Sequence, residues 1–338
     1  MATRGYQSYR GRNHGKLALV IVLVLILLAA VGYLVAQEYM VYDDEGHRHL
    51  ELPFLKKGQT EQPQQPEDTT PDDVDLIIDE PEHPLLKELH ARQLPDTVLT
   101  EDPSTVLAEH PEAVVIPVKL RDGTVTYDTQ TAARDTVTTG GPETLTSLKT
   151  LLSGDTWTVA RIACFADMDF ANAKPDEAGL LRTGDGWLWY DDDAACWLDP
   201  GKAAAREYLV QLCKECAELG FDEILLDYCT YPVHGRLDRI DYGSVTNLTD
   251  TLSVFVEGVR EALPKTTALS VLVRDQVTAD ANDGGVTIAL LTEHFDRIYV
   301  ETTAEQLPAL TAALEPYDAE LVPILSEAPA SGSYLLTA

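Results

Sequence analysis

The sequence predicts an α/β protein whose main domain is a (β/α)8 TIM-like barrel, preceded by a single transmembrane helix. Three observations support this prediction. Short apolar runs alternate with helical patterns from about residue 84 onward, and such alternation favours a parallel sheet with right-handed crossovers. Seven or eight of these units in about 250 residues fit a closed barrel better than an open sheet. An uncharged stretch near the N-terminus has the length of a membrane span.

The predicted membrane anchor covers residues 17–36, twenty consecutive residues without a charge. At about 1.5 Å per helical residue, this length crosses the roughly 30 Å hydrocarbon core of a bilayer. Basic residues precede the span and acidic residues follow it, which places the N-terminus in the cytoplasm. The alternative is a cleaved signal peptide, which would have a shorter apolar region and a small-residue exit. We therefore expect a single-pass plasma membrane protein with an extracytoplasmic domain.

Composition divides the chain into four parts: a basic cytoplasmic tail (1–16), the transmembrane anchor (17–36), an acidic stalk rich in Pro and Gln (37–83) and the barrel domain (84–338). Residues 61–83 contain nine acids and no Lys or Arg. Because such a segment cannot bury enough apolar surface to fold, we expect the stalk to be a disordered spacer.

Charge and motifs exclude several functions. The net charge of −31 argues against nucleic acid as a partner, since phosphate binding needs basic patches. The chain has no GxGxxG, no GxxxxGK[ST] and no HExxH. Its one CxxC, from Cys213 to Cys216, lies on the apolar stripe of a predicted helix, where cysteine acts as a small hydrophobe. The sequence therefore predicts neither a cofactor nor a metal.

The predicted elements follow one another in regular order. Strands are expected at 97–99, 113–120, 156–165, 223–228, 268–273, 297–300, 320–325 and 334–336. Helices are expected at 102–110, 142–152, 201–219, 245–263, 286–294 and 304–314. The first helix has Pro103 in its first turn, where a missing N–H costs little. The first and last strands are the weakest, so an incomplete or divergent barrel remains an alternative.

The strand at 223–228 carries the strongest functional signal. Its apolar run is entered through Gly220 and ends at a carboxylate, Asp227, with Tyr228 and Tyr231 directly after it. In α/β barrels, chemistry takes place at the C-terminal ends of the strands. Asp227 is therefore the first candidate for a catalytic residue.

Other strands also end in carboxylates, which would meet on the same face of a barrel. They are Asp167, Asp275, Glu301 and Glu327. Paired carboxyl groups are what glycoside hydrolysis requires, and aromatic rings offer apolar faces for sugars. Candidate rings are Trp187, Trp189, Trp197, Tyr228 and Tyr231. Because the chain has 56 acids, an acid near a strand end can also arise by chance.

Two charged residues lie inside strand patterns, Lys119 and Arg161. Each either lines the barrel mouth and pairs with a carboxylate, or forms a structural ion pair. The acidic run from Asp191 to Asp193 is interpreted as a solvated loop, because it lacks EF-hand spacing. A serine or cysteine nucleophile is not supported, since there is no GxSxG and no histidine suitably placed.

Three segments resemble a known family: 161–167 (RIACFAD), 197–200 (WLDP) and 220–232 (GFDEILLDYCTYP). They are similar to a largely uncharacterised bacterial glycoside hydrolase family with a TIM-barrel fold, distantly related to α-amylase-type barrels. Its pattern runs roughly RIxxFKD, WxDP and GFDEIQFDYxRFP. The segment 115–129 also looks like the second-strand region of this family.

The resemblance implies that Asp227 matches the strand-four acid, analogous to an amylase-type nucleophile. The chain departs from the pattern elsewhere. Ala166 replaces a lysine, Thr230 stands in place of the arginine before the final aromatic, and Leu120 and Leu272 fall where the family has acids. The resemblance therefore indicates a divergent member, in which catalysis is either retained or lost.

Together these patterns predict a membrane-anchored, extracytoplasmic glycoside hydrolase-like protein that acts on a polysaccharide. Asp227 is expected as nucleophile or charge stabiliser, with Glu301 or Asp275 as general acid. Expected substrate-binding residues are Asp167, Trp187, Trp197, Tyr228, Tyr231, Arg161, Lys119 and Glu327. The alternative is a catalytically inactive barrel that binds cell-envelope or environmental glycans.

Overall fold

The computed structural model describes residues 40–42, 48–50, 85–274, 283–317 and 319–337. The chain divides into two compact units, Met1–Leu76 and Ile77–Ala338. In the first unit, strand β1 (Met40–Tyr42) pairs with β2 (Arg48–Leu50) in antiparallel fashion. The predicted tail, the predicted anchor and most of the predicted stalk lie outside the described residues. Among the residues that are described, no helix is long and apolar enough to cross a membrane.

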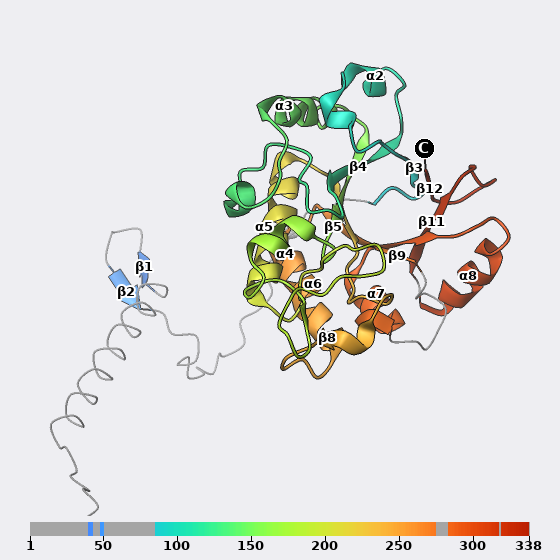
Figure 1. Cartoon of the computed structure of the whole chain (residues 1–338). Helices are drawn as coiled ribbons and strands as arrows, with labels where there is room; N and C mark the ends of the chain where they lie inside the picture. Colours follow the sequence, from blue (N-terminus) through green and yellow to red (C-terminus); the bar gives the residue numbers. More distant parts are fainter. Residues whose placement is uncertain (1–39, 43–47, 51–84, 275–282, 318, 338) are drawn as a thin grey trace, which may run out of the picture. The chain divides into compact units, whose positions relative to one another are not determined.

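The second unit contains a closed barrel of eight parallel strands in the order β10-β11-β12-β3-β4-β5-β7-β9 (Figure 1). The strands are β3 (His90–Gln93), β4 (Ala113–Lys119), β5 (Trp157–Ala163), β7 (Glu223–Asp227), β9 (Ala268–Val273), β10 (Arg297–Glu301), β11 (Glu320–Leu325) and β12 (Tyr334–Leu336). This topology confirms the (β/α)8 prediction. Three of these strands, β4, β7 and β9, are buried along their whole length, as expected for parallel strands covered on both faces.

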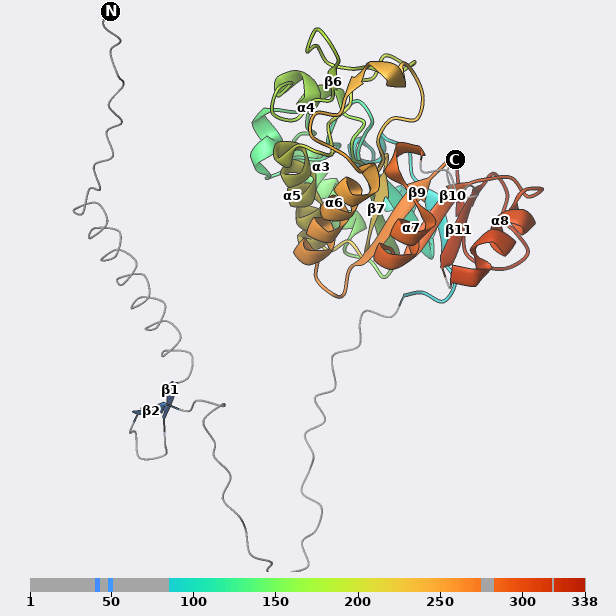
Figure 2. The ribbon, with the colours of Figure 1, turned by 90° about the horizontal axis from the view of Figure 1, so that it is seen from below.

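Helices surround the barrel (Figures 1 and 2). They are α2 (Ser104–Leu107), α3 (Pro142–Leu151), α4 (Met168–Ala173), α5 (Ala203–Leu219), α6 (Leu248–Ala262), α7 (Ile288–His294) and α8 (Leu307–Leu314). The longest of them, α5, ends at Gly220, whose φ of 107° is the left-handed conformation that glycine adopts most readily. Cys213 and Cys216 are both buried on its inner face as free thiols, which confirms the interpretation of the CxxC as part of an apolar stripe.

One predicted strand was wrong. Residues 97–99 fall largely in a 3-10 helix (Val98–Thr100), and the first barrel strand is β3, a few residues earlier. The sequence of β3 is HARQ, in which only Ala91 is buried. Three of its four residues are polar, so it lacks the apolar run by which a buried strand is recognised in a sequence.

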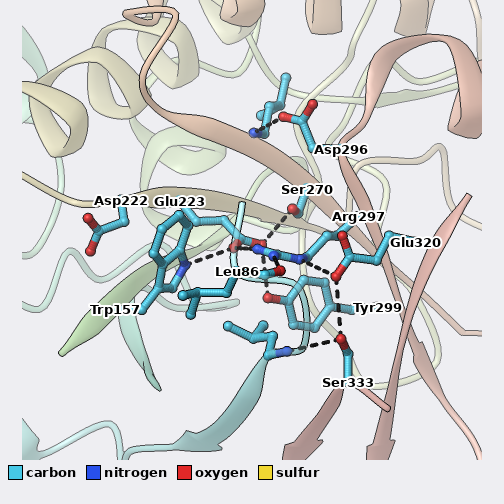
Figure 3. A network of polar contacts seen from close by, with 12 residues as sticks. Leu86, Trp157, Asp222, Glu223, Ser270, Asp296, Arg297, Tyr299, Glu320 and Ser333 are labelled. Carbon is cyan, nitrogen blue, oxygen red and sulfur yellow. Dashed lines mark hydrogen bonds and ion pairs between the residues drawn. The ribbon is translucent and has the colours of Figure 1, made fainter. Parts of the chain in front are cut away.

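The N-terminal end of the barrel is filled by a buried charge network (Figure 3). Glu223, the first residue of β7, is fully buried and accepts four hydrogen bonds. The donors are Trp157 Nε1 (3.0 Å), Ser270 Oγ (2.6 Å), Arg297 Nη1 (2.7 Å) and Tyr299 OH (2.8 Å). The network therefore compensates the desolvation of a buried carboxylate with a cation and three neutral donors.

Arg297 extends this network to the first residue of β11 and to the segment before β3. Its Nε donates to Glu320 Oε1 (2.9 Å) and its Nη2 to the carbonyl of Leu86 (2.7 Å). Ser333 Oγ in turn contacts Glu320 Oε1 (3.3 Å) and accepts from the N–H of Leu89 (3.0 Å). Because β12 and β3 pair over only a few residues, these contacts help to close the barrel.

We expect Glu223→Leu to lower the free energy of unfolding by about 3–5 kcal/mol, because it leaves the buried Arg297 guanidinium without its main counterion. The double variant Glu223→Leu/Arg297→Met should recover part of this loss. Urea denaturation followed by tryptophan fluorescence measures both. Strictly additive losses in the double variant would contradict the coupling.

Candidate active site

Four barrel strands deliver polar side chains to one site at the C-terminal end of the barrel. Arg161 comes from β5, Asp227 is the last residue of β7, Arg274 directly follows β9, and Glu301 ends β10. The strands β5, β7, β9 and β10 are consecutive neighbours in the sheet. The parallel sheet therefore gathers these residues as the sequence predicted for Asp227 and Glu301.

Asp227 is buried and holds five hydrogen bonds. Arg161 donates to Oδ2 through Nε (2.9 Å) and Nη2 (2.6 Å). Arg274 donates to Oδ1 through Nη1 (2.6 Å) and to Oδ2 through Nη2 (3.1 Å). The N–H of Tyr228 donates to Oδ1 (2.8 Å). Both carboxylate oxygens are therefore occupied by protein donors.

The charge state of Asp227 follows from these contacts. Burial alone would raise the pKa of this carboxyl group, but the guanidinium groups of Arg161 and Arg274 outweigh burial and hold its pKa below the ordinary value. Asp227 is therefore ionised at neutral pH. An ionised carboxylate can act as nucleophile or charge stabiliser, but it cannot donate a proton as general acid.

Arg274 links Asp227 to the second candidate carboxylate. Its Nε lies 3.3 Å from Glu301 Oε1, and the side chain of Glu301 is half-exposed. Because one guanidinium contacts both groups, their nearest oxygens are at most about 8 Å apart. Carboxyl separations of about 5–5.5 Å and about 6.5–9.5 Å characterise retaining and inverting glycosidases, respectively. The Asp227–Glu301 separation is thus short enough for a pair of this kind.

Tyr228 lines a cavity of about 230 Å³, the cavity over Tyr228, which Arg274 also lines. Its backbone has a φ of 50°, a left-handed conformation that is costly for a residue with a side chain and that often marks functional sites. Two guanidinium groups lie near its ring centroid, that of Arg274 at 4.3 Å and that of Arg121 at 5.5 Å. The ring packs against Trp197 in a T-shaped arrangement, and His234 also lines the cavity.

Lys119 and Asp167 form a second ion pair, which does not line this cavity. Lys119 Nζ lies 2.9 Å from Asp167 Oδ2, and both side chains are fully buried. Lys119 also donates to the carbonyl of Ala163 (2.6 Å), while Asp167 caps helix α4 by accepting from the N–H of Phe170. Burial raises the pKa of Asp167 despite the nearby ammonium group. The sequence left two interpretations of Lys119 open, a residue at the barrel mouth and a structural ion pair. These contacts correspond to the structural ion pair.

The remaining predicted residues are not gathered around Asp227. Tyr231, expected to stack on a sugar, is fully buried with its ring against Tyr242. Trp187 is 71% exposed on the loop after β6 (Leu181–Arg182), and Glu327 is exposed after β11. Asp275 lies outside the described residues. Trp197 and Tyr228, the other two predicted aromatic residues, line the cavity over Tyr228.

Sequence reasoning missed Arg274 and Arg121 as site residues. Arg274 follows the apolar run of β9 directly, just as Asp227 ends the apolar run of β7. Its position at a strand end could therefore have marked it as a candidate site residue. Asp191 was misread as part of a solvated run. Its carboxylate is buried and accepts hydrogen bonds from Trp197 Nε1 (2.9 Å) and Arg121. Burial acts to raise the pKa of Asp191, but these donors lower it overall.

The closed barrel thus gathers a carboxylate, arginines and aromatic rings at its C-terminal end. A family described as "Putative glycosyl hydrolase domain" matches residues 102–300, more than half of the chain. The chain belongs to this family, which confirms the resemblance seen in the sequence. A comparison with curated proteins gave no match.

Several solved structures are similar to the chain. A hypothetical protein from Ruminiclostridium thermocellum ATCC 27405 has 25% identity and a TM-score of 0.45, with 54% of this chain and 96% of that chain covered. A family GH13_31 enzyme has 10% identity and a TM-score of 0.49, covering 76% and 66%. An α-galactosidase from Thermus thermophilus has 14% identity and a TM-score of 0.42, covering 64% and 42%. The chain thus spans about two thirds of the length of the GH13_31 enzyme and less than half of the length of the α-galactosidase.

The lowered pKa of Asp227 predicts how the free energy of unfolding changes with pH. The ionised carboxylate stabilises the fold fully above its unfolded pKa of about 3.9, and this contribution is lost as pH falls through the lower folded pKa. We expect Asp227→Asn to lower the free energy of unfolding by about 3–5 kcal/mol at pH 7, with the difference from the unmodified protein shrinking below pH ~4.

Urea denaturation at a series of pH values measures this difference. Asp192→Asn is a matched control, because Asp192 is an exposed aspartate that lines the cavity over Tyr228, and it should leave stability nearly unchanged. A deficit for Asp227→Asn that stays constant from pH 7 to pH 3 would contradict the assignment.

Proposed function

We propose that this barrel binds a glycan in the cavity over Tyr228, and that Asp227 holds Arg161 and Arg274 in position rather than attacking the sugar. One observation carries the proposal: both oxygens of Asp227 are occupied by two arginines and a backbone N–H, and the residue is only 1% exposed. A nucleophile needs a free oxygen directed at the anomeric carbon.

The cavity has the composition of a sugar site. Tyr228 and Trp197 offer aromatic surface for the apolar face of a pyranose, while Arg274 and His234 offer polar groups for hydroxyls. Leu272 lines the same cavity at the position where the resemblance places an acid of the family. Loss of that acid removes one carboxylate from the cavity but leaves a surface suited to binding.

As part of the same proposal, residues 17–36 anchor the protein in the membrane and the barrel lies outside the cell. This part is supported by the uncharged stretch, its basic flank and the acidic segment at 61–83. A cell-envelope or environmental polysaccharide is the partner that such a position would make accessible.

Hydrolysis is the second candidate function, favoured by the short separation between Asp227 and Glu301. In that case Asp227 acts as nucleophile or charge stabiliser and Glu301 as general acid. Nucleophilic attack by Asp227 requires Arg274 to move away from it, because Arg274 contacts the carboxylates of both Asp227 and Glu301 in this structure.

The binding proposal predicts that Tyr228→Ala weakens the affinity for a glycan identified by array screening by about tenfold, because the stacking surface is lost. Tyr228→Phe keeps the ring and should bind nearly as well. Isothermal titration calorimetry measures both affinities, with circular dichroism to verify folding. Equal binding by the Ala variant and the unmodified protein would remove this cavity as the site.

Hydrolysis predicts a different result in a reducing-end assay on the bound glycan. If Glu301 is the general acid, Glu301→Gln should lower the rate of product release by about 10²–10⁴-fold. The binding proposal instead predicts no product from either protein. Product release by the unmodified protein that Glu301→Gln abolishes would replace the binding proposal with hydrolysis.

A further inference from the structure

A second cavity of about 300 Å³ adjoins the cavity over Tyr228. The two cavities share Asp191 and Asp192 in their walls. Three arginines line the second cavity: Arg182, Arg236 and Arg239. This grouping is unusual in a chain with only 25 basic residues against 56 acids, and the barrel's own strands contribute none of the three.

Backbone contacts hold the three arginines in place. Strand β6 pairs in antiparallel fashion with β8 (Ile240–Asp241), which sets Arg182 opposite Ile240. The N–H of Thr183 donates to the carbonyl of Arg239 (2.9 Å), and Trp189 Nε1 donates to the carbonyl of Arg236 (3.0 Å). Figure 2 shows the segments after β5 and β7 beside each other. The cavity wall is therefore formed by paired segments and not by a single loop.

The unpaired charge in this cavity is positive. Arg182 pairs with Asp185 (3.1 Å). The carboxylate of Asp191 pairs with Arg121 and accepts a hydrogen bond from Trp197 Nε1. Within the part of the chain that the structure describes, the guanidinium groups of Arg236 and Arg239 form no hydrogen bond or ion pair, and both residues are exposed. Among the described residues that line this cavity, two guanidinium groups and one carboxylate, that of Asp192, are thus unpaired.

Exposed aromatic rings lie next to these charges. Tyr190 lines the cavity, is 53% exposed and has the guanidinium of Arg182 5.8 Å from its ring centroid. Trp187 is 71% exposed, and its carbonyl accepts from the N–H of Arg182 (2.7 Å). Exposed aromatic side chains beside a cavity mark an interaction surface, and they offer stacking area for further sugar rings.

We propose that the second cavity is an anion-recognising subsite, and that the ligand is a glycan chain bearing carboxylate or phosphate groups that extends there from the cavity over Tyr228. The inference rests on the proposed glycan binding. Planar guanidinium groups bind carboxylates and phosphates through paired, charge-assisted hydrogen bonds. Arg236 and Arg239 supply these groups for the ligand, while Tyr190 and Trp187 contact its sugar rings.

The test measures affinities of the full-length protein by isothermal titration calorimetry. The probes are oligogalacturonate, the same oligomer as its neutral methyl ester, and a poly(glycerol phosphate) chain. The test variant is Arg236→Gln/Arg239→Gln. The control variant is Arg92→Gln/Arg134→Gln, which removes the same charge at two positions that line neither cavity.

We expect at least one acidic probe to bind about tenfold or more tightly than the methyl ester, with an affinity that falls as salt rises. The test variant should lose this preference, and the control variant should keep it. Whether the carboxylate or the phosphate probe binds identifies the source of the anion. Unchanged thermal unfolding of the test variant would establish that a loss of affinity is not a loss of fold.

Three results would overturn the inference. If neither acidic probe binds more tightly than the methyl ester, or if the test variant keeps the preference, the second cavity does not recognise charge, while glycan binding over Tyr228 stands. If neither the probes nor a wider glycan panel bind, both the inference and the proposed function fail.

Discussion

The pairing of Asp227 with Arg161 and Arg274 is the interaction on which the rest of the site depends. A carboxylate as buried as this one is stable in its charged form only with cations and hydrogen-bond donors around it. These partners fix the positions of both arginines, and Arg274 in turn packs over the ring of Tyr228 and contacts Glu301. The same pairing that organises the site also withdraws Asp227 from solvent.

Strand β7 carries a buried acid at each end, and the two have different consequences. Glu223 and Asp227 are four residues apart, so their side chains lie on the same face of the strand, with Leu225 between them. Leu225 belongs to the apolar cluster that includes Tyr299 and Val322. At the N-terminal end the acid is enclosed by a complete network that closes the barrel. At the C-terminal end the partners of the acid border a cavity, where a ligand can reach them.

The sequence allowed most of the barrel to be predicted, because buried parallel strands such as β7 and β9 are short apolar runs between helices. Strand β3 escaped detection because only Ala91 in it is buried. The site was harder to predict. That Asp227 follows a strand is visible in the chain, but its two arginine partners come from β5 and from the end of β9. Pairing across strands is a tertiary property, as is the burial of Asp191 within an acidic run.

The structure of the protein with a bound oligosaccharide tests the central claim most directly. We expect a sugar ring stacked on the part of the Tyr228 ring that Arg274 leaves open, with the contacts of Asp227 to Arg161 and Arg274 intact. An Arg274 side chain displaced from Asp227, with a carboxylate oxygen of Asp227 within about 3–3.5 Å of an anomeric carbon, would contradict it and establish Asp227 as the nucleophile.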